Sequence, residues 1–370
     1  MSPVVLHVSQ PVTAGVAVVV TQLVADQVER GWDVHVASPE GWLAERAAAL
    51  GAVVHPWAAG RSPGPGVLGE TRRLAAVVDA VAPDVVHLHS SKAGLTGRLA
   101  VRGRIPTVFQ PHMWSFQASS GPVGAASLAW ERAGARWTHR LLCVGADELA
   151  AGRAAGVTGE AVVVPNGVDT AVLRPADRAA ARRAHGLPTA PTVVCVGRLA
   201  EQKGQDLLLA AWPAVLDAVP DARLVLVGEG PMQARWRAAH PDSPSVRWAG
   251  PTDDPGSWFA AADVVALPSR SEGMALVPLE AMSCARSVVA FDVGGVRESL
   301  GEGTGAVVAR GDVDALAAAL VSRLADPTSA DLEGVRGRDR AVRGFDRRRV
   351  AAQVADVVAA LAVPAAAGGR

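Results

Sequence analysis

The sequence predicts an α/β protein made of two domains, each built on a doubly wound parallel sheet. In both halves, short apolar runs rich in β-branched residues alternate with amphipathic segments of helical period. Such βαβ alternation produces parallel strands joined by right-handed crossovers. A chain of 370 residues is also long enough to bury two separate cores. We therefore predict a first domain over residues 1–180 and a second domain over residues 181–346.

The apolar runs give the strands, and the segments between them give the helices. In the first domain we expect strands at 4–8, 34–37, 85–88, 141–144 and 162–164, another strand beginning at 105, helices at 16–30 and 69–81, and a loop rich in Gly and Pro at 51–66. In the second domain we expect strands at 192–196, 223–227, 246–250, 264–267, 287–291 and 305–308, with helices at 206–219 and 313–324.

The composition argues against several classes of function. The 36 Lys and Arg residues balance the 36 Asp and Glu residues without a basic block, so no nucleic acid partner is expected. No apolar run reaches the roughly 18 residues of a membrane span, and the N-terminal residues lack the basic region of a signal peptide. Cys143, Cys195 and Cys284 are isolated in apolar surroundings, which predicts buried free thiols. The histidines have no metal-ligand spacing, so no metal is expected.

One strand–loop–helix unit in the second half organises the candidate site. The buried strand at 264–267 opens into a polar turn containing Glu272 and Gly273, and a helix begins near Leu276, because Pro278 is tolerated only in a helix's first turn. Free N–H groups at a helix start bind anions. Glu272 and Glu280 can each accept hydrogen bonds from neighbouring hydroxyls, as a sugar ring or ribose offers. The unit predicts a nucleotide-sugar site lined by Gly273, Met274, Ala275 and Leu276.

The phrase around these two glutamates, Ser-Glu-Gly-Met-Ala-Leu-Val-Pro-Leu-Glu-Ala-Met at 271–282, resembles the signature of family 4 of the retaining glycosyltransferases, which have the GT-B fold. The resemblance extends over nearly the whole chain, and within the family it points to bacterial members that assemble polysaccharides and glycolipids. It implies two Rossmann-like domains facing a cleft, with a C-terminal helix at 347–363 that crosses back to the first domain. The alternative is a surface loop followed by an amphipathic helix with two ordinary glutamates.

A second stretch similar to the family follows the first strand of the second domain. The resemblance implies that Arg198 and Lys203 grip the donor diphosphate, that Gly197 lets the backbone turn, and that Gly228 lies near the nucleotide base. A departing nucleoside diphosphate gains negative charge, which fixed cations and helix N-termini can stabilise. Lys203 and Lys92 are the only lysines in an arginine-rich chain, and the two residue types are not equivalent at a compact phosphate contact. A solvated loop is the alternative.

The first domain is expected to hold the acceptor, at the edge where open α/β sheets bind ligands. Ser90 or Ser91 is predicted to cap the helix after the strand at 85–88, with Lys92 in its first turn. In the family, a histidine at the place of His112 lies beside the reacting sugar. Trp114 is expected to be either an apolar platform for sugar or lipid, or a core residue.

At the turn after the first strand, the backbone of the first domain is expected to approach a phosphate of the donor. Members of the family usually have a pair of glycines here, whereas this chain has Ala14-Gly15. Gly15 is therefore expected to allow close backbone approach to the donor, while position 14 is not. A simple tight turn would use the same residues.

These expectations combine into a retaining, metal-independent glycosyltransferase. It would move a sugar from a UDP- or GDP-sugar to a hydroxyl acceptor such as a lipid-linked saccharide or a polysaccharide intermediate. The predicted catalytic residues are His112, Arg198, Lys203 and Glu272. The enzyme would be cytoplasmic, with peripheral attachment at the inner face of the membrane left open. The alternatives are a nucleotide-sugar epimerase of the same fold and a non-catalytic subunit that binds nucleotide sugars.

Overall fold

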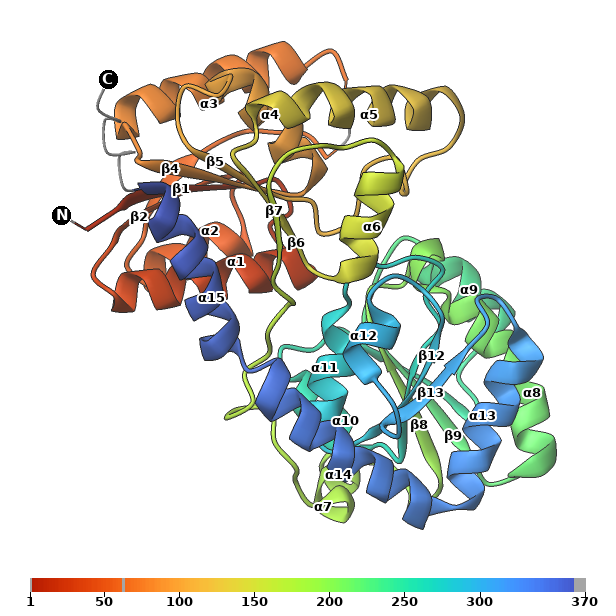
Figure 1. The fold of residues 1–370 in the computed structure, drawn as a ribbon. Coiled ribbons are helices and arrows are strands. Elements are labelled where there is room, and N and C mark those ends of the chain that lie inside the picture. The colour runs from red at the N-terminus through yellow and green to blue at the C-terminus, as the bar shows by residue number, and fades with distance from the viewer. Residues whose placement is uncertain (1, 62–63, 363–370) are drawn as a thin grey trace. The chain divides into compact units, whose positions relative to one another are not determined.

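The chain forms two compact units in a computed structural model, which describes residues 2–61 and 64–362 (Figure 1). The first unit comprises the residues up to Asn166 together with the segment from Arg347, and the second comprises Gly167–Asp346. The C-terminal helix α15 (Arg347–Ala362) packs against α1 (Ala14–Glu29) of the first unit, as the sequence led us to expect.

The first unit contains a seven-stranded parallel sheet in the order β3-β2-β1-β4-β5-β6-β7. Its strands are β1 (Val4–Ser9), β2 (Asp33–Ser38), β3 (Val53–Pro56), β4 (Val85–His89), β5 (Thr107–Gln110), β6 (Arg140–Cys143) and β7 (Ala161–Val163). The helices after α1 are α2 (Trp42–Ala49), α3 (Val67–Val81), α4 (Ser90–Val101), α5 (Gly121–Gly134), the short 3₁₀ turn η1 (Ala135–Trp137) and α6 (Ala146–Ala154).

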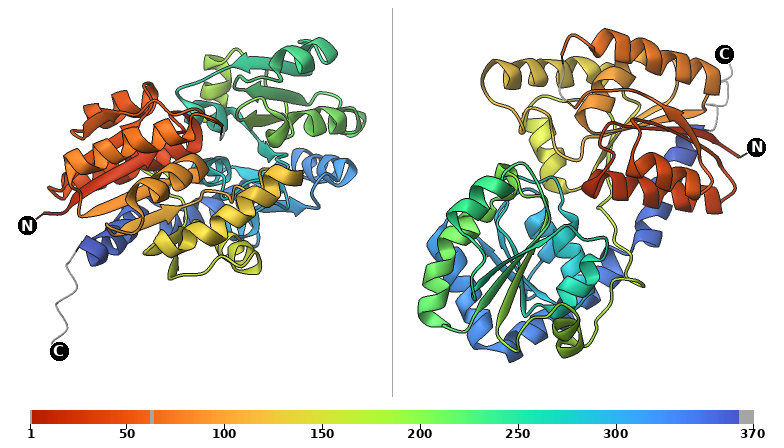
Figure 2. Two further views of the ribbon diagram at one scale, coloured as in Figure 1. Left: turned by 90° about the horizontal axis from the view of Figure 1, so that it is seen from above. Right: turned by 180° about the vertical axis from the view of Figure 1, so that it is seen from behind.

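Helices cover both faces of this sheet, so each face has its own core (Figure 2). Leu6 and Val8 of β1 pack with Leu88 of β4 into the core beneath α3 and α4. On the other face, residues of α1, α2 and β2 form a separate core, which includes Val20 and Val36. Successive strand residues point to opposite faces. The residues that alternate with Leu6, Val8 and Leu88 along β1 and β4 therefore lie on the α1 side of the sheet.

The second unit contains a six-stranded parallel sheet in the order β10-β9-β8-β11-β12-β13. Its strands are β8 (Thr192–Val196), β9 (Arg223–Val227), β10 (Val246–Gly250), β11 (Val264–Leu267), β12 (Ser287–Phe291) and β13 (Gly305–Val308). Its helical segments are α7 (Arg178–Ala184), η2 (Glu201–Lys203), α8 (Gln205–Ala218), α9 (Gln233–Ala239), α10 (Pro255–Ala261), α11 (Leu276–Ser283), α12 (Val296–Leu300), α13 (Val313–Ala325) and α14 (Pro327–Gly344). Two doubly wound parallel sheets confirm the predicted fold class.

The structure corrects the predicted boundary between the domains. Residues 167–180 belong to the second unit, whereas the sequence assigned them to the first. The reason is a set of hydrogen bonds that side chains of the second unit donate to backbone oxygens of this segment. Arg338 donates to the carbonyl oxygens of Thr170 and Leu173 at 2.9 and 2.8 Å, and Arg286 donates to that of Ala176 at 3.4 Å.

Some elements escaped the sequence analysis. The stretch at 51–66, expected to be a loop, contains the edge strand β3, which pairs with β2. Helices α2, α5, α9, α10 and α14 were also not predicted, because they are short or interrupted by charges and glycines. Ser90 does not cap α4: it is the helix's first residue, the cap residue is His89, and no side chain bonds the free N–H groups there.

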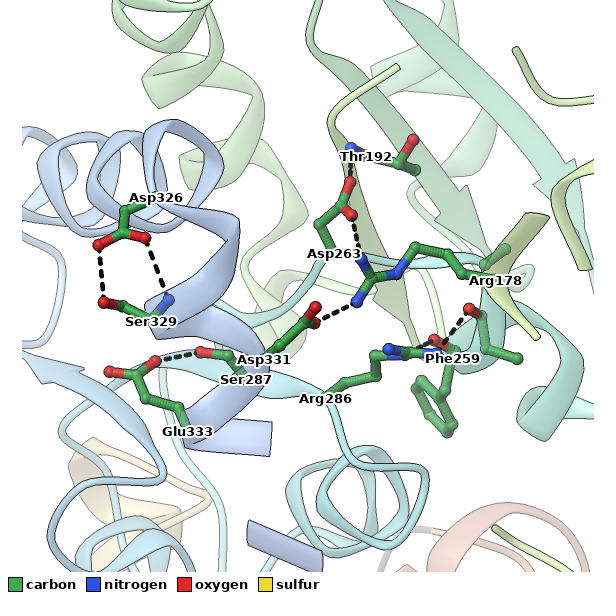
Figure 3. Close-up of polar contacts among 12 residues, drawn as sticks. Arg178, Thr192, Phe259, Asp263, Arg286, Ser287, Asp326, Ser329, Asp331 and Glu333 are labelled. Carbon is green, nitrogen blue, oxygen red and sulfur yellow. Dashed lines mark hydrogen bonds and ion pairs between the residues drawn. The ribbon is translucent and has the colours of Figure 1, made fainter. Parts of the chain in front are cut away.

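The N-terminal edge of the second sheet is held by a polar network (Figure 3). Asp263, which precedes β11, accepts a 2.6 Å hydrogen bond from the backbone N–H of Thr192 in β8. The same carboxylate pairs with Arg178 at 3.2 Å and with Arg182. Ser287, the first residue of β12, donates to Glu333 of α14. Buried charges at this edge are therefore paired and hydrogen-bonded.

Cys143, Cys195 and Cys284 are free and buried, as predicted. Burial raises the pKa of the Cys195 and Cys284 thiols to about 12, so these side chains behave as small apolar core residues. Within residues 2–61 and 64–362, no helix is both long and apolar enough to cross a bilayer.

Candidate active site

The candidate donor site of the second unit lies where the strand order reverses. In its sheet β8 is flanked by β9 on one side and β11 on the other, so the chain winds outward in opposite directions from this pair. The loops after β8 and β11 separate at such a switch point, which leaves a crevice at the C-terminal ends of the strands. Lys203 lies in the first of these loops and Glu272 in the second. The predicted residues are therefore on the loops where an open α/β sheet binds a ligand.

Glycines let these loops pack closely. Gly204 has a φ of +68°, and a Cβ at this residue would lie 1.9 Å from the carbonyl oxygen of Pro268. Gly228 has a φ of +137°, and its Cβ would lie 2.1 Å from the carbonyl oxygen of Gly197. No side chain fits at either place. Gly197 and Gly228 thus have a definite packing role at this edge, joining the loops after β8 and β9.

Lys203 and Glu272 form a direct ion pair. Nζ of Lys203 donates to Oε1 of Glu272 at 2.6 Å, although the two residues are 69 positions apart in the chain. The lysine side chain is 25% exposed, and that of the glutamate is 8% exposed. The cation therefore faces solvent while its partner is enclosed, and a ligand anion could reach the lysine from the open side.

Glu280 lies beyond this pair, on α11. Enclosure of its carboxyl group raises its pKa to about 7, and the nearby positive charge of Lys203 lowers the pKa only in part. Near neutral pH this glutamate exchanges a proton easily, and hydroxyl groups that donate to it would favour its ionised form. A strongly shifted carboxyl group at a switch point is a functional-site signal.

The start of α11 completes this side of the site. The helix begins at Leu276, as predicted, after Ala275, and no side chain caps it. Its first N–H groups are therefore available to an anion. The preceding loop packs against the turn before α12: a Cβ at Gly294 would lie 2.6 Å from the carbonyl oxygen of Glu272, and one at Gly295 would lie 2.4 Å from that of Gly273. Met274 and Ala275 are buried and hold the loop in place.

Arg198 lies on the same loop as Lys203, directly after Gly197, and is partly exposed. Its carbonyl oxygen accepts a 3.2 Å hydrogen bond from the amide of Gln205 at the start of α8. The structure thus brings Lys203, Glu272 and Glu280 together and places Arg198 on the adjoining backbone.

In the first unit, the predicted residues also follow strands at a switch point, between β1 and β4. The backbone is strained at Ser90 and His112, with φ of 65° and 58°, and at the neighbouring Ala14 and Met113, with φ of 62° and 153°, although none of these residues is glycine. Each such conformation costs about 1–3 kcal/mol and typically persists at functional sites. Gly15 is exposed beside Ala14. The C-terminal edge of β1, β4 and β5 is therefore the candidate site of this unit.

Two predicted acceptor residues have other partners. Trp114 is fully buried, donates from Nε1 to the carbonyl oxygen of Glu148 at 2.7 Å, and packs against Phe109 and Phe116. It is a core residue, so the platform hypothesis is wrong. Lys92 is 4% exposed, and its Nζ donates to the carboxylate of Glu70 at 2.8 Å. This pair within the first unit was not foreseen.

The sequence analysis also missed a cluster of histidines. His7 of β1 is the register partner of His87 of β4, and both lie with His89 on the α1 side of the sheet. One ring nitrogen from each residue lies within 4.8 Å of the others. Spacing along the chain concealed this cluster, but the strand alternation of β1 and β4 would have placed all three on one face.

Solved structures show the class of fold that these units define. The chain superimposes on Anabaena HepE in complex with UDP-glucose with a TM-score of 0.85 and 21% sequence identity, over 97% of this chain and 100% of the other. The fold is therefore GT-B.

Sequence comparison identifies the family. The family described as "Glycosyltransferase Family 4" matches residues 13–172, and the family described as "Glycosyl transferases group 1" matches residues 190–326. A D-inositol 3-phosphate glycosyltransferase of Kineococcus radiotolerans is 35% identical over 301 residues, covering 71% of this chain and 68% of that protein. The chain belongs to the family 4 glycosyltransferases.

A second relative is similar over a shorter stretch. A GDP-mannose-dependent monoacylated α-(1-6)-phosphatidylinositol monomannoside mannosyltransferase of Corynebacterium glutamicum is 38% identical over 189 residues, which is 47% of this chain. The match spans 50% of the length of that relative.

Proposed function

We propose that this protein transfers a sugar from a nucleoside-diphosphate donor to a hydroxyl group of an acceptor. The observation that carries the proposal is the convergence of Lys203, Glu272 and Glu280 at the switch point of the second sheet. A cation, an uncapped helix start and two carboxylates match the parts of a nucleotide sugar: its diphosphate, its ribose and its sugar ring.

Each residue has a specific task in this proposal. Lys203, Arg198 and the first N–H groups of α11 bind the diphosphate, with Gly15 at the corresponding turn of the first unit. Glu280 accepts hydrogen bonds from the ribose hydroxyls. Glu272 accepts from the sugar hydroxyls and keeps Lys203 oriented through their 2.6 Å contact. His112 and Ser90 contact the reacting sugar and the acceptor.

The relatives favour a particular donor and acceptor. The Corynebacterium protein is named as dependent on GDP-mannose and as acting on a phosphatidylinositol mannoside, and the Kineococcus protein is named for D-inositol 3-phosphate. We propose GDP-mannose as the first donor to test, with a UDP-sugar next. The proposed acceptor is an inositol-containing glycolipid or a related lipid-linked saccharide.

The proposed step retains the anomeric configuration and uses no metal ion. The acceptor oxygen attacks the anomeric carbon from the face that the diphosphate leaves. The bond between that carbon and the phosphate oxygen breaks, and the acceptor proton passes to the departing phosphate oxygen. Arg198, Lys203 and the start of α11 stabilise the negative charge that develops on the leaving group.

A thermal-shift screen tests the donor class. The diphosphates of uridine, guanosine, adenosine and thymidine are each compared with and without an attached sugar, and we expect stabilisation by GDP-mannose above that by GDP. Glu272→Ala should remove the sugar-dependent part of the shift and reduce the part due to the diphosphate less, because Arg198 and the start of α11 still bind the diphosphate. Equal shifts by all eight compounds, or by none, would contradict the proposed donor site.

Turnover with an acceptor tests the reaction. We expect an α-linked product from GDP-mannose, identified by the one-bond carbon–proton coupling at the anomeric carbon, and an unchanged rate in EDTA. Formation of a new sugar nucleotide without acceptor would instead identify an epimerase. Donor binding without any product across inositol, glycolipid and saccharide acceptors would identify a binding subunit.

A further inference from the structure

A chain of hydrogen bonds runs from helix α1 through the first sheet to His112. Nε2 of His7 lies 2.8 Å from the amide oxygen of Gln27. Nδ1 of His7 lies 3.0 Å from Nε2 of His89, and Nδ1 of His89 lies 3.3 Å from Nε2 of His112. Gln27, His7 and His89 are at most 1% exposed, whereas His112 is partly exposed. The chain therefore connects the buried interior to the C-terminal edge of the sheet.

The three imidazoles of this hydrogen-bond chain are neutral at physiological pH. Burial lowers the pKa of His7 to about 4 and that of His112 to about 3, and it lowers the pKa of His89 well below its usual value. A neutral imidazole carries one N–H and one lone pair. Each ring in the chain must therefore donate to one side and accept from the other.

The amide oxygen of Gln27 sets the direction of these bonds. Because an oxygen only accepts, Nε2 of His7 carries the proton and its Nδ1 is a lone pair. His89 then donates from Nε2 to His7, and its own Nδ1 accepts from His112. His112 is left with a proton on Nε2 and a lone pair on Nδ1. The amide nitrogen of Gln27 has no hydrogen-bond partner among the described residues, and turning the amide over would reverse every donor, so the orientation of Gln27 decides the tautomer.

A metal ion fits this cluster less well than a hydrogen-bond chain. The ligand atoms of His7, His87 and His89 are close enough for one ion. However, the rings of His87 and His89 lie against each other, tilted, with centroids 4.0 Å apart and planes 30° apart. Imidazole lone pairs lie in the ring plane, so two rings that face each other this closely do not direct their lone pairs at one point. Neither ring nitrogen of His87 has a hydrogen-bond partner of normal geometry, and its face packs on His89.

We propose that Gln27, His7 and His89 are positioning residues that fix His112 in the Nε2–H tautomer, so that its Nδ1 lone pair accepts a hydrogen bond from a substrate hydroxyl. The strained backbone of His112, with φ of 58°, holds the ring at the edge. The hydroxyl belongs to the sugar or acceptor, so this role rests on the proposed function. The tautomer of His112 itself does not depend on the proposed function.

The tautomer is measured on protein labelled with ¹⁵N at histidine, by long-range proton–nitrogen spectra of the imidazole rings, with His112→Asn as the assignment control. We expect His112 with a protonated Nε2 and an unprotonated Nδ1. Gln27→Glu, which can only accept, should keep this tautomer, and Gln27→Leu should give a mixture. His35→Asn is the matched control, because His35 and His55 form a separate pair at 2.8 Å in the same sheet.

A proton on Nδ1 of His112, or a tautomer that Gln27→Leu leaves unchanged, would overturn the inference. A shift of the His7, His87 and His89 signals on addition of one equivalent of Zn²⁺ would also overturn it, because a bound ion would take the place of the hydrogen bonds between these rings. Circular dichroism and melting temperatures establish that each variant is folded.

Kinetics test the role of the fixed tautomer. In Gln27→Leu we expect a KM for the substrate that binds His112 about tenfold higher, as for one lost hydrogen bond to a neutral group, with recovery in Gln27→Glu. Unchanged kinetics in a variant with a mixed tautomer would refute the positioning role. A fixed tautomer in a protein that transfers no sugar would refute the proposed function and leave the hydrogen-bond chain standing.

Discussion

The two edges of the second sheet are built in opposite ways. At the N-terminal edge, Asp263 is bonded by the backbone N–H of Thr192 and by Arg178 (Figure 3), as well as by Arg182, and its side chain is 11% exposed. At the C-terminal edge, glycine loops surround the Lys203–Glu272 ion pair, an uncapped helix start and a carboxyl group with a pKa raised to about 7. The first edge satisfies its charges internally, and the second leaves charges that a ligand can satisfy. Stability and function are therefore expected to separate between the edges.

The largest expected effect is at the closed edge. Asp263→Ala leaves Arg182 without its carboxylate partner, and breaking a buried ion pair costs about 3–5 kcal/mol. We expect this loss in the free energy of unfolding, measured by urea denaturation, with nucleotide affinity of the folded protein unchanged. Asp339→Ala is the control: its pair with Arg343 is exposed and should be worth less than about 1 kcal/mol. Lost affinity with intact stability would show that the edges do not separate in this way.

The next effect is at the open edge. Lys203→Met removes a cation from the leaving group and should lower kcat by about 10²–10³-fold. It also leaves the enclosed carboxylate of Glu272 unpaired, so some stability is lost as well. The double variant Lys203→Met with Glu272→Gln should recover that stability without recovering activity. Steady-state kinetics and melting curves on the set measure both, and recovery of activity in the double variant would contradict the assigned role.

A smaller effect separates loop packing from backbone strain. Gly204→Ala and Gly311→Ala both place a side chain at positive φ, at a cost of about 1–2 kcal/mol. A Cβ at residue 204 would lie 1.9 Å from the carbonyl oxygen of Pro268, whereas a Cβ at residue 311 would meet no atom within 4 Å outside its own chain neighbours. We expect Gly204→Ala to lose more stability and to displace Lys203, lowering nucleotide affinity. Equal melting temperatures and affinities in the two variants would mean that the loop adjusts freely.

The smallest expected effect is the pH dependence of Glu280. Nucleotide affinity should rise as pH increases through about 7, because the ionised carboxyl accepts the ribose hydroxyls. Glu280→Gln should lack this dependence and bind about tenfold more weakly at high pH, by analogy with one lost charged hydrogen bond. Isothermal titration of both proteins across the range measures the difference, and parallel pH profiles would refute the assignment.

The same substitution should stabilise the free protein at high pH. The folded pKa of Glu280 is raised from 4.5 to about 7, so the folded state binds more protons than the unfolded state between these values. Stability from this group is full below the unfolded pKa and is lost as pH rises to about 7. Glu280→Gln should therefore melt above the wild type at pH 8 and close to it at pH 4.

Sequence patterns predicted the strands well where β-branched residues are dense and buried, as in β8 and β11. They failed at β3, an edge strand of mixed exposure, and at α14, whose helix is rich in charges and glycine. For short or exposed elements, tertiary packing decides the structure more than local preference does.

The candidate site could be predicted only where its residues belong to one continuous segment of the sequence. Glu272 and Glu280 belong to one strand–loop–helix unit, so their meeting follows from local structure. Trp114 was ambiguous because an aromatic residue after a strand can face solvent or the core. The partner of Lys92, Glu70, lies on another helix, and the His7–His89 contact joins two strands 82 residues apart. Such pairs depend on the register between distant elements.

The return of α15 to the first unit has a consequence for synthesis on the ribosome. This helix packs against α1 and β4, yet it follows the whole second unit in the sequence. The second unit is contiguous and can fold as soon as it has emerged, whereas the first must wait, with that surface bare, until the segment from Arg347 has emerged. Nascent chains halted near residue 346 should consequently be captured by chaperones through the uncovered surface of α1.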